Sequence, residues 1–69
     1  MEMVELYKVL SDSTKIIVVE DRFKYLYLNE PSIYQGNVYS IPVKVINRRI
    51  HFMKPCIIDN EQYIFCEVD

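Results

Sequence analysis

Apolar and polar residues alternate, or apolar residues run together, along most of the chain after residue 14. The apolar positions are mainly Ile, Val, Tyr and Phe, whose branched or aromatic side chains favour an extended backbone. An alternation with a period of two places successive side chains on opposite faces of a sheet. The pattern therefore predicts short strands, which we expect over residues 15–20, 23–28, 38–46, 49–53, 56–58 and 62–68.

Short polar residues, prolines and the single glycine separate these segments. They predict breaks at residues 11–14, 29–32, 35–37, 47–48, 54–55 and 59–60. Pro42 lacks an amide donor, so its strand is expected at an edge or with a bulge. Five or six short strands at this spacing predict an all-β fold, a small barrel or roll of mostly antiparallel strands, with residues 1–69 as a single β-rich domain.

Residues 2–10 leave two interpretations open. Met3, Leu6 and Leu10 have the spacing of one helical face. Val4 and Leu6, which alternate with their neighbours, suit a strand as well. A helix of this length is marginal without tertiary contacts, so a strand is slightly favoured over a short N-terminal helix.

The two cysteines lie on either side of the hairpin turn predicted at residues 59–60. A two-residue turn sets a register in which Cys56 lies opposite Tyr63. Cys66 then lies opposite Met53, a position about 10 Å along that strand from Cys56. A disulfide needs Cα atoms within about 7 Å of each other, so we expect two free thiols. No Cys-x-x-Cys or His-x-x-x-His spacing is present, and no metal site is expected.

The small size and the composition argue against catalysis. The chain has 69 residues, with one His and one Gly. One glycine cannot form a Gly-rich phosphate cradle, and so short a chain has little room for a cleft that excludes water. We therefore expect no enzyme activity, no catalytic residue and no cofactor.

The longest apolar runs have four residues, far fewer than the roughly 20 that a membrane-spanning helix needs. Residues 1–5 are acidic, where a secretory signal is basic and then apolar. These features predict a cytoplasmic protein without a membrane partner. Nine Ile and no Ala are typical of a low-GC genome, so a low-GC bacterium or its phage is the expected source.

Charge is distributed in blocks. Residues 36–58 hold four basic residues and no acid, whereas residues 59–69 hold four acids and no base. Cations beside aromatic rings suit phosphates and single-stranded bases. One hypothesis is therefore a small barrel that binds nucleic acid or an anionic nucleotide through the basic hairpin 44–54, with contacts from Lys44, Arg48, Arg49, His51 and Lys54. The alternative is a solvated face on which the basic and acidic hairpins balance each other. The net charge of −2 makes nucleic acid the less favoured partner.

Six tyrosines exceed what a core of this size buries with every hydroxyl satisfied. Exposed aromatic residues are typical of protein interfaces. The leading hypothesis is therefore a non-enzymatic accessory or inhibitory protein, of the kind that phages and mobile elements encode, which occupies the surface of another protein. Its expected contact residues are Tyr25, Tyr27, Tyr39, Arg48, Arg49 and Phe52.

The branched run Ile16–Val19 is expected to form an exposed sheet edge. Pairing of this edge between two copies would remove it from water and enlarge the core. We therefore also expect a homo-oligomer, most simply a homodimer.

Overall fold

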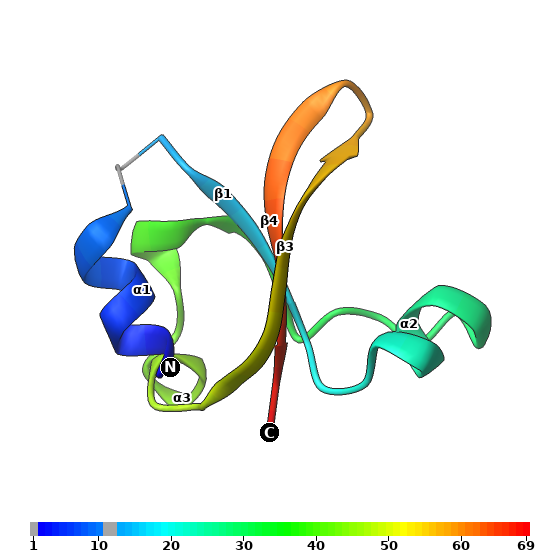
Figure 1. The fold of residues 1–69 in the computed structure, drawn as a ribbon, viewed down its shortest axis with the longest axis horizontal. Helices are drawn as coiled ribbons and strands as arrows, with labels where there is room; N and C mark the ends of the chain where they lie inside the picture. Colours follow the sequence, from blue (N-terminus) through cyan, green and yellow to red (C-terminus); the bar gives the residue numbers. More distant parts are fainter. Residues whose placement is uncertain (1, 11–12) are drawn as a thin grey trace.

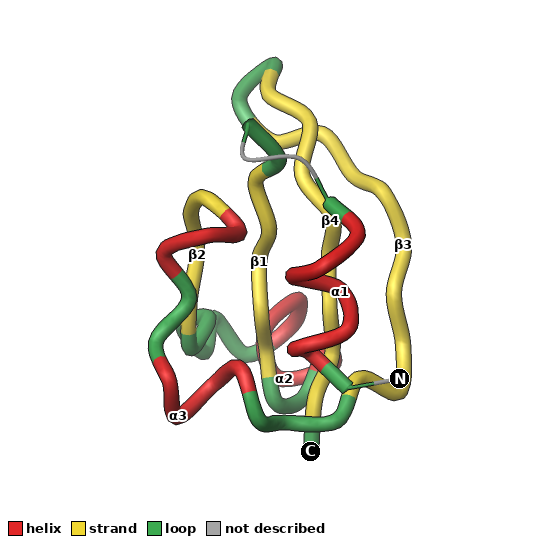
Figure 2. The backbone as a smooth tube through the Cα atoms, turned by 90° about the vertical axis from the view of Figure 1, so that its left-hand side faces the viewer, coloured by secondary structure: helices red, strands yellow, loops and turns green. Residues whose placement is uncertain are grey.

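The computed structural model describes residues 2–10 and 13–69, which form an open four-stranded sheet with helices on both faces (Figure 1). The elements are α1 (Met3–Val9), β1 (Lys15–Val19), α2 (Arg22–Tyr27), β2 (Tyr34–Asn37), the 3₁₀-helix η1 (Val38–Ser40), α3 (Val43–Ile46), β3 (Ile50–Ile58) and β4 (Glu61–Val68). The strand order is β2-β1-β4-β3 (Figure 2). The central strands β1 and β4 are parallel, and each outer strand is antiparallel to its neighbour.

The sheet-rich character predicted from the sequence is confirmed, but the predicted barrel is wrong. The sheet does not close, because β2 and β3 each have one free edge. Two segments predicted as strands, 23–28 and 38–46, are helical, and the predicted strands 49–53 and 56–58 form one strand, β3. With β2 as an additional strand, the described part of the chain has four strands. No helix within residues 2–10 and 13–69 has the length and apolar character needed to cross a membrane.

Residues 3–9 form α1 rather than the slightly favoured strand. The Glu5 carboxylate accepts a hydrogen bond from the Glu2 amide (2.9 Å), which completes a cap at the start of the helix. Met3 and Leu6 are buried against the sheet on one helical face. Tertiary packing therefore stabilises this short helix. Residues 11 and 12 of the predicted break at 11–14 lie outside the described residues.

The segment 23–28, predicted as a strand, forms most of α2. The Asp21 carboxylate accepts hydrogen bonds from the amides of Phe23 (2.9 Å) and Lys24 (3.2 Å), as an N-cap does. The segment is apolar or aromatic at nearly every position, so it fits a period of two and a period of 3.6 equally well. The capping carboxylate favours the helix. The loop predicted at 29–32 is confirmed.

The segment 38–46 is also helical where a strand was predicted. The Asn37 side chain caps η1, and the Pro42 carbonyl accepts the first hydrogen bonds of α3. Val38 of η1 and Val45 of α3 are both buried in the same core cluster. Pro42 therefore precedes a helix, where its fixed φ is suitable, and does not mark an edge strand. The basic hairpin predicted around residues 47–48 does not form.

β1 lies in the middle of the sheet, so the predicted exposed edge at Ile16–Val19 is wrong. Each of these four residues is at most 1% exposed. Their side chains point alternately into a cluster beneath α1, η1 and α3 and into a second cluster that contains Phe65. A strand that is buried on both faces has a continuous apolar run for this reason.

The hairpin of β3 and β4 has the predicted register. The turn residues Asp59 and Asn60 have φ values of 52° and 66°, the left-handed conformation of a two-residue hairpin turn. Cys56 lies opposite Tyr63 and Cys66 lies opposite Met53, as predicted. Both cysteines are free thiols.

Both edge strands are poorly suited to pairing with another chain. β2 has only four residues and replaces the turn predicted at 35–37. β3 continues through the interruption predicted at 54–55, with Pro55 inside it. In an antiparallel hairpin the directly hydrogen-bonded pairs alternate with pairs that lack these bonds, starting here with the bonded pair Ile58 and Glu61. Pro55 belongs to a pair without these bonds, so its backbone nitrogen points away from β4. The missing amide donor therefore lies on the free edge.

Candidate functional site

α2 projects from the sheet on the face opposite α1 and α3 (Figure 1). Phe23, Leu26 and Tyr27 have the spacing of one helical face, and their exposed fractions are 59%, 56% and 71%. The rings of Phe23 and Tyr27 contact each other, with centroids 5.2 Å apart. Leu28, at the C-cap, is 62% exposed. We call these four residues the apolar α2 surface.

α2 differs from an ordinary surface helix. Such a helix turns its apolar face to the core and its polar face to water. No residue of α2 is buried, and its largest apolar side chains face solvent. A group of neighbouring exposed apolar side chains marks an interaction site more often than single, scattered ones do.

The opposite side of α2 lies on an aromatic cluster of the sheet. Tyr25 is half-buried, with its ring centroid 5.8 Å from that of Phe65. Phe52 meets Phe65 edge-on at 6.4 Å between centroids. The Arg22 guanidinium covers the Phe52 ring at 3.8 Å from its centroid, a cation–π contact. These contacts hold the helix while leaving the apolar α2 surface free.

Glu67 connects the start of α2 to β4. Glu67 is only 9% exposed, and its carboxylate accepts a hydrogen bond from the Arg22 amide (2.6 Å). His51 lies between two acids, with Nε2 3.0 Å from a Glu67 carboxylate oxygen and Nδ1 3.0 Å from an Asp69 oxygen. The buried carboxylate thus has polar partners from α2 and β3, which fix the direction in which α2 leaves the sheet.

The predicted contact residues are scattered over the molecule. Tyr27 belongs to the apolar α2 surface, and Tyr25 and Phe52 lie beneath the helix. Arg48 lies close to the start of α2, because its guanidinium binds the Glu20 carboxylate at 2.7 Å. Arg49 is exposed and forms an isolated β-bridge with Glu2.

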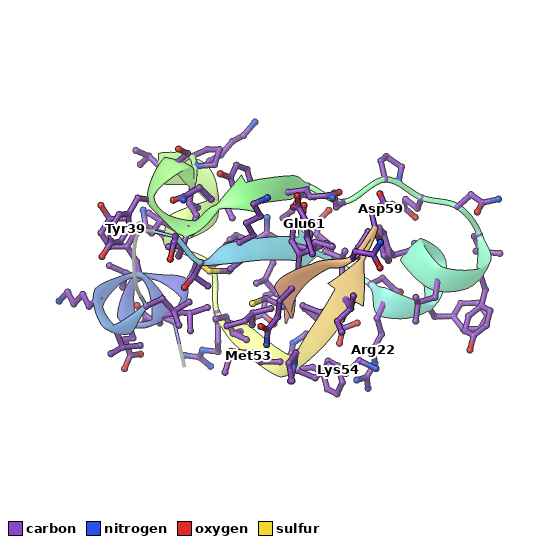
Figure 3. The ribbon with its side chains drawn as sticks, turned by 90° about the horizontal axis from the view of Figure 1, so that it is seen from above. Arg22, Tyr39, Met53, Lys54, Asp59 and Glu61 are labelled. Atoms are coloured by element: carbon purple, nitrogen blue, oxygen red, sulfur yellow. The ribbon has the colours of Figure 1, made fainter. Side chains whose placement is uncertain are left out.

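Tyr39 is separate from the other predicted contacts. Its ring packs on Tyr7, with centroids 4.7 Å apart, and its hydroxyl donates a hydrogen bond to the Leu10 carbonyl (3.0 Å). Figure 3 shows Tyr39 and Arg22 at opposite ends of the molecule. In this position Tyr39 helps to hold η1 against α1.

The five residues of the nucleic-acid hypothesis do not form one basic surface. Arg48 pairs with Glu20, and His51 is flanked by Glu67 and Asp69. Lys44 is on α3 and meets Arg48 at a cavity of about 330 Å³ lined also by Ile33 and Val45. Lys54 is exposed in the middle of β3.

The sequence interpretation missed Phe23, Leu26 and Leu28 of the apolar α2 surface, and also Arg22 and Glu67. The missed signal is the acid at Asp21, a preferred N-cap residue, directly before apolar residues spaced at i, i+3 and i+4. Glu67 carries no such signal, because its role depends on the parallel pairing of β1 with β4.

The ionisable groups with shifted pKa values lie away from α2. Burial, with a smaller effect of Cys56, raises the pKa of the Cys66 thiol to about 12. Hydrogen bonding to Glu61 raises the pKa of Lys15, and the same bond lowers the pKa of Glu61. In the part of the chain that the structure describes, no group of three His, Cys, Asp or Glu side chains is arranged to hold a metal ion.

Comparison of the chain with known proteins finds no match. No protein-family model matches the chain, and no curated protein and no solved structure matches it.

Proposed function

We propose that this chain is a small non-enzymatic protein, accessory or inhibitory in its action, that works by binding the surface of another protein. The observation that carries the proposal is the apolar α2 surface, where four large apolar side chains are each more than half exposed on one short element. Recognition by apolar anchors at i, i+3 and i+4 is an established mode of helix-to-groove binding.

The surroundings of α2 support contact through side chains. Both sheet edges are short or interrupted by proline, so neither offers a long row of backbone groups to a partner strand. The Asp21 cap, the Arg22–Phe52 contact and the Glu67 carboxylate hold α2 before any partner arrives. A surface that is already ordered loses less entropy on binding than a flexible one does.

The proposal divides the predicted contact residues by role. Tyr27 is an anchor, while Tyr25 and Phe52 support the helix from below. Arg48, which pairs with Glu20 directly before the N-cap of α2, is proposed as a charged contact, and such groups affect the association rate and the choice of partner more than the affinity.

The test compares two substitutions that replace an exposed apolar residue by an acid. Leu26→Glu changes the apolar α2 surface, and Val43→Glu changes α3, where Val43 is 76% exposed. A protein from the source cell that binds the immobilised chain and the Val43→Glu variant, but not the Leu26→Glu variant, is then purified and titrated. We expect its affinity to fall at least about tenfold with Leu26→Glu. Equal binding by all three chains would contradict the proposal.

A further inference from the structure

We infer that the apolar α2 surface is occupied by a second copy of this chain, in a two-fold dimer of α2 against α2. The inference rests on the proposed function, because it assigns an occupant to the same surface. A two-fold interface uses the same patch on both subunits. It therefore requires a patch that is compatible with itself in shape, charge and area.

The shape of α2 allows such pairing. α2 has only six residues and stands away from the sheet, so two copies can approach side by side (Figure 1). Phe23, Leu26 and Tyr27 form a continuous apolar face on each copy. A contact between different patches would instead build a ring or an open filament and not a two-fold dimer.

The charges around the surface cancel. Residues 21–30 carry Asp21, Arg22, Lys24 and Glu30, two of each sign. Lys24 and Glu30 are exposed beside the apolar α2 surface, and their backbones are linked by a hydrogen bond from the Glu30 amide to the Lys24 carbonyl (3.1 Å). The surroundings of the apolar α2 surface therefore carry no net charge that would oppose the approach of a second copy.

The area is adequate for a small dimer. Four large apolar side chains that are 56–71% exposed offer roughly 500 Å² on each copy. Together with the charged rim, two copies bury about 1,200 Å², the lower limit of specific interfaces. A chain of 69 residues also has a limited core of its own, and dimerisation supplements it.

The first experiment measures the mass of the full-length chain by sedimentation over a range of concentrations. We expect the wild-type chain and Val43→Glu to reach twice the monomer mass of 8.3 kDa. Leu26→Glu should raise the dimer dissociation constant at least about tenfold while its circular dichroism stays like that of the wild type. A wild-type chain that stays monomeric, or a dimer that Leu26→Glu leaves intact, would overturn the inference.

A second experiment changes only charge. Lys24→Glu makes residues 21–30 acidic and Glu30→Lys makes them basic, so each variant alone should dimerise at least about tenfold more weakly. An equimolar mixture of the two should regain the dimer as a heterodimer. Failure of the mixture to associate, with both variants folded, would exclude the two-fold α2 contact.

The outcomes separate the two proposals. If the chain is monomeric but a partner still depends on Leu26, the α2 surface binds another protein and the dimer is wrong. If the chain is monomeric and no protein depends on Leu26, both proposals fail.

Discussion

Glu67 is the clearest case of a single residue that determines the position of an element. It is nearly buried and connects β4 to the Arg22 amide and to the His51 ring. A buried polar group that loses its partner costs more than the hydrogen bond contributed. Removal of the Glu67 carboxylate would leave the Arg22 amide without its acceptor and would break the ion pair between Glu67 and the Arg22 guanidinium.

We expect Glu67→Ala to lower the free energy of unfolding by about 1–3 kcal/mol, measured by urea denaturation. Glu61→Ala is the matched control, because Glu61 lies on the same strand as Glu67 but is exposed, and it pairs with the exposed Lys15 of β1. The control should have a smaller effect, since exposed ion pairs contribute little. An effect of Glu61→Ala as large as that of Glu67→Ala would show that Glu67 has no special role.

The two cysteines should differ in reactivity. Cys66 is fully buried and burial raises the pKa of its thiol to about 12, whereas Cys56 is half-buried. A thiol-specific reagent at pH 8 should therefore modify one cysteine in the folded chain and both in denaturant. Cys56→Ser should remove the reaction of the folded chain. A fast reaction of the folded Cys56→Ser chain would contradict this assignment.

The raised pKa of Cys66 also predicts a dependence of stability on pH. Unfolding returns the pKa from about 12 to its ordinary value of 9.0. Above pH 9 the unfolded chain releases a proton that the folded chain keeps, so the free energy of unfolding falls as pH rises from 9 toward 12. Cys66→Ala should flatten this part of the stability profile. An unchanged slope would contradict the assignment.

At the scale of elements, the sequence predicts the bounds of β1 and β4 and the hairpin turn at 59–60 well and the helices poorly. The β3–β4 register follows from the two-residue turn at 59–60, which is a local feature. In the segment 23–28 the apolar pattern fits the period of a strand and the period of a helix. The N-cap at Asp21 favours the helix, and the apolar pattern alone does not indicate this cap. The exposure of the apolar α2 surface cannot be predicted from the sequence, because it depends on which side of the helix contacts Phe65.

The cap itself is testable. Asp21→Ala removes the acceptor of the Phe23 and Lys24 amides, and we expect a loss of about 1 kcal/mol in the stability of α2. Because α2 is held by few contacts, faster hydrogen exchange of its amides should show the loss more clearly than global unfolding does. Asp21→Asn keeps an oxygen acceptor and should retain protection. Equal protection in Asp21→Ala would show that the cap does not hold α2.

At the scale of the molecule, folding pairs part of the charge blocks of the sequence with opposite charges from other segments. Arg48 of the basic block binds Glu20, and His51 lies between Glu67 and Asp69. Lys15 pairs with Glu61 from the acidic C-terminal block. The apolar residues differ between the two faces of the sheet (Figure 1). On one face they are buried beneath α1 and α3, whereas on the other face α2 exposes apolar side chains to water.

The central claim is that α2 is a contact surface. Its most direct test is photo-cross-linking in the source cell, with p-benzoylphenylalanine placed at Tyr27 in one chain and at Val43 in another. Both side chains are more than 70% exposed, so access to the probe is matched. We expect a defined protein adduct from position 27, with a second copy or with another protein, and none from position 43. Equal labelling at the two positions, or no adduct from position 27, would contradict the account.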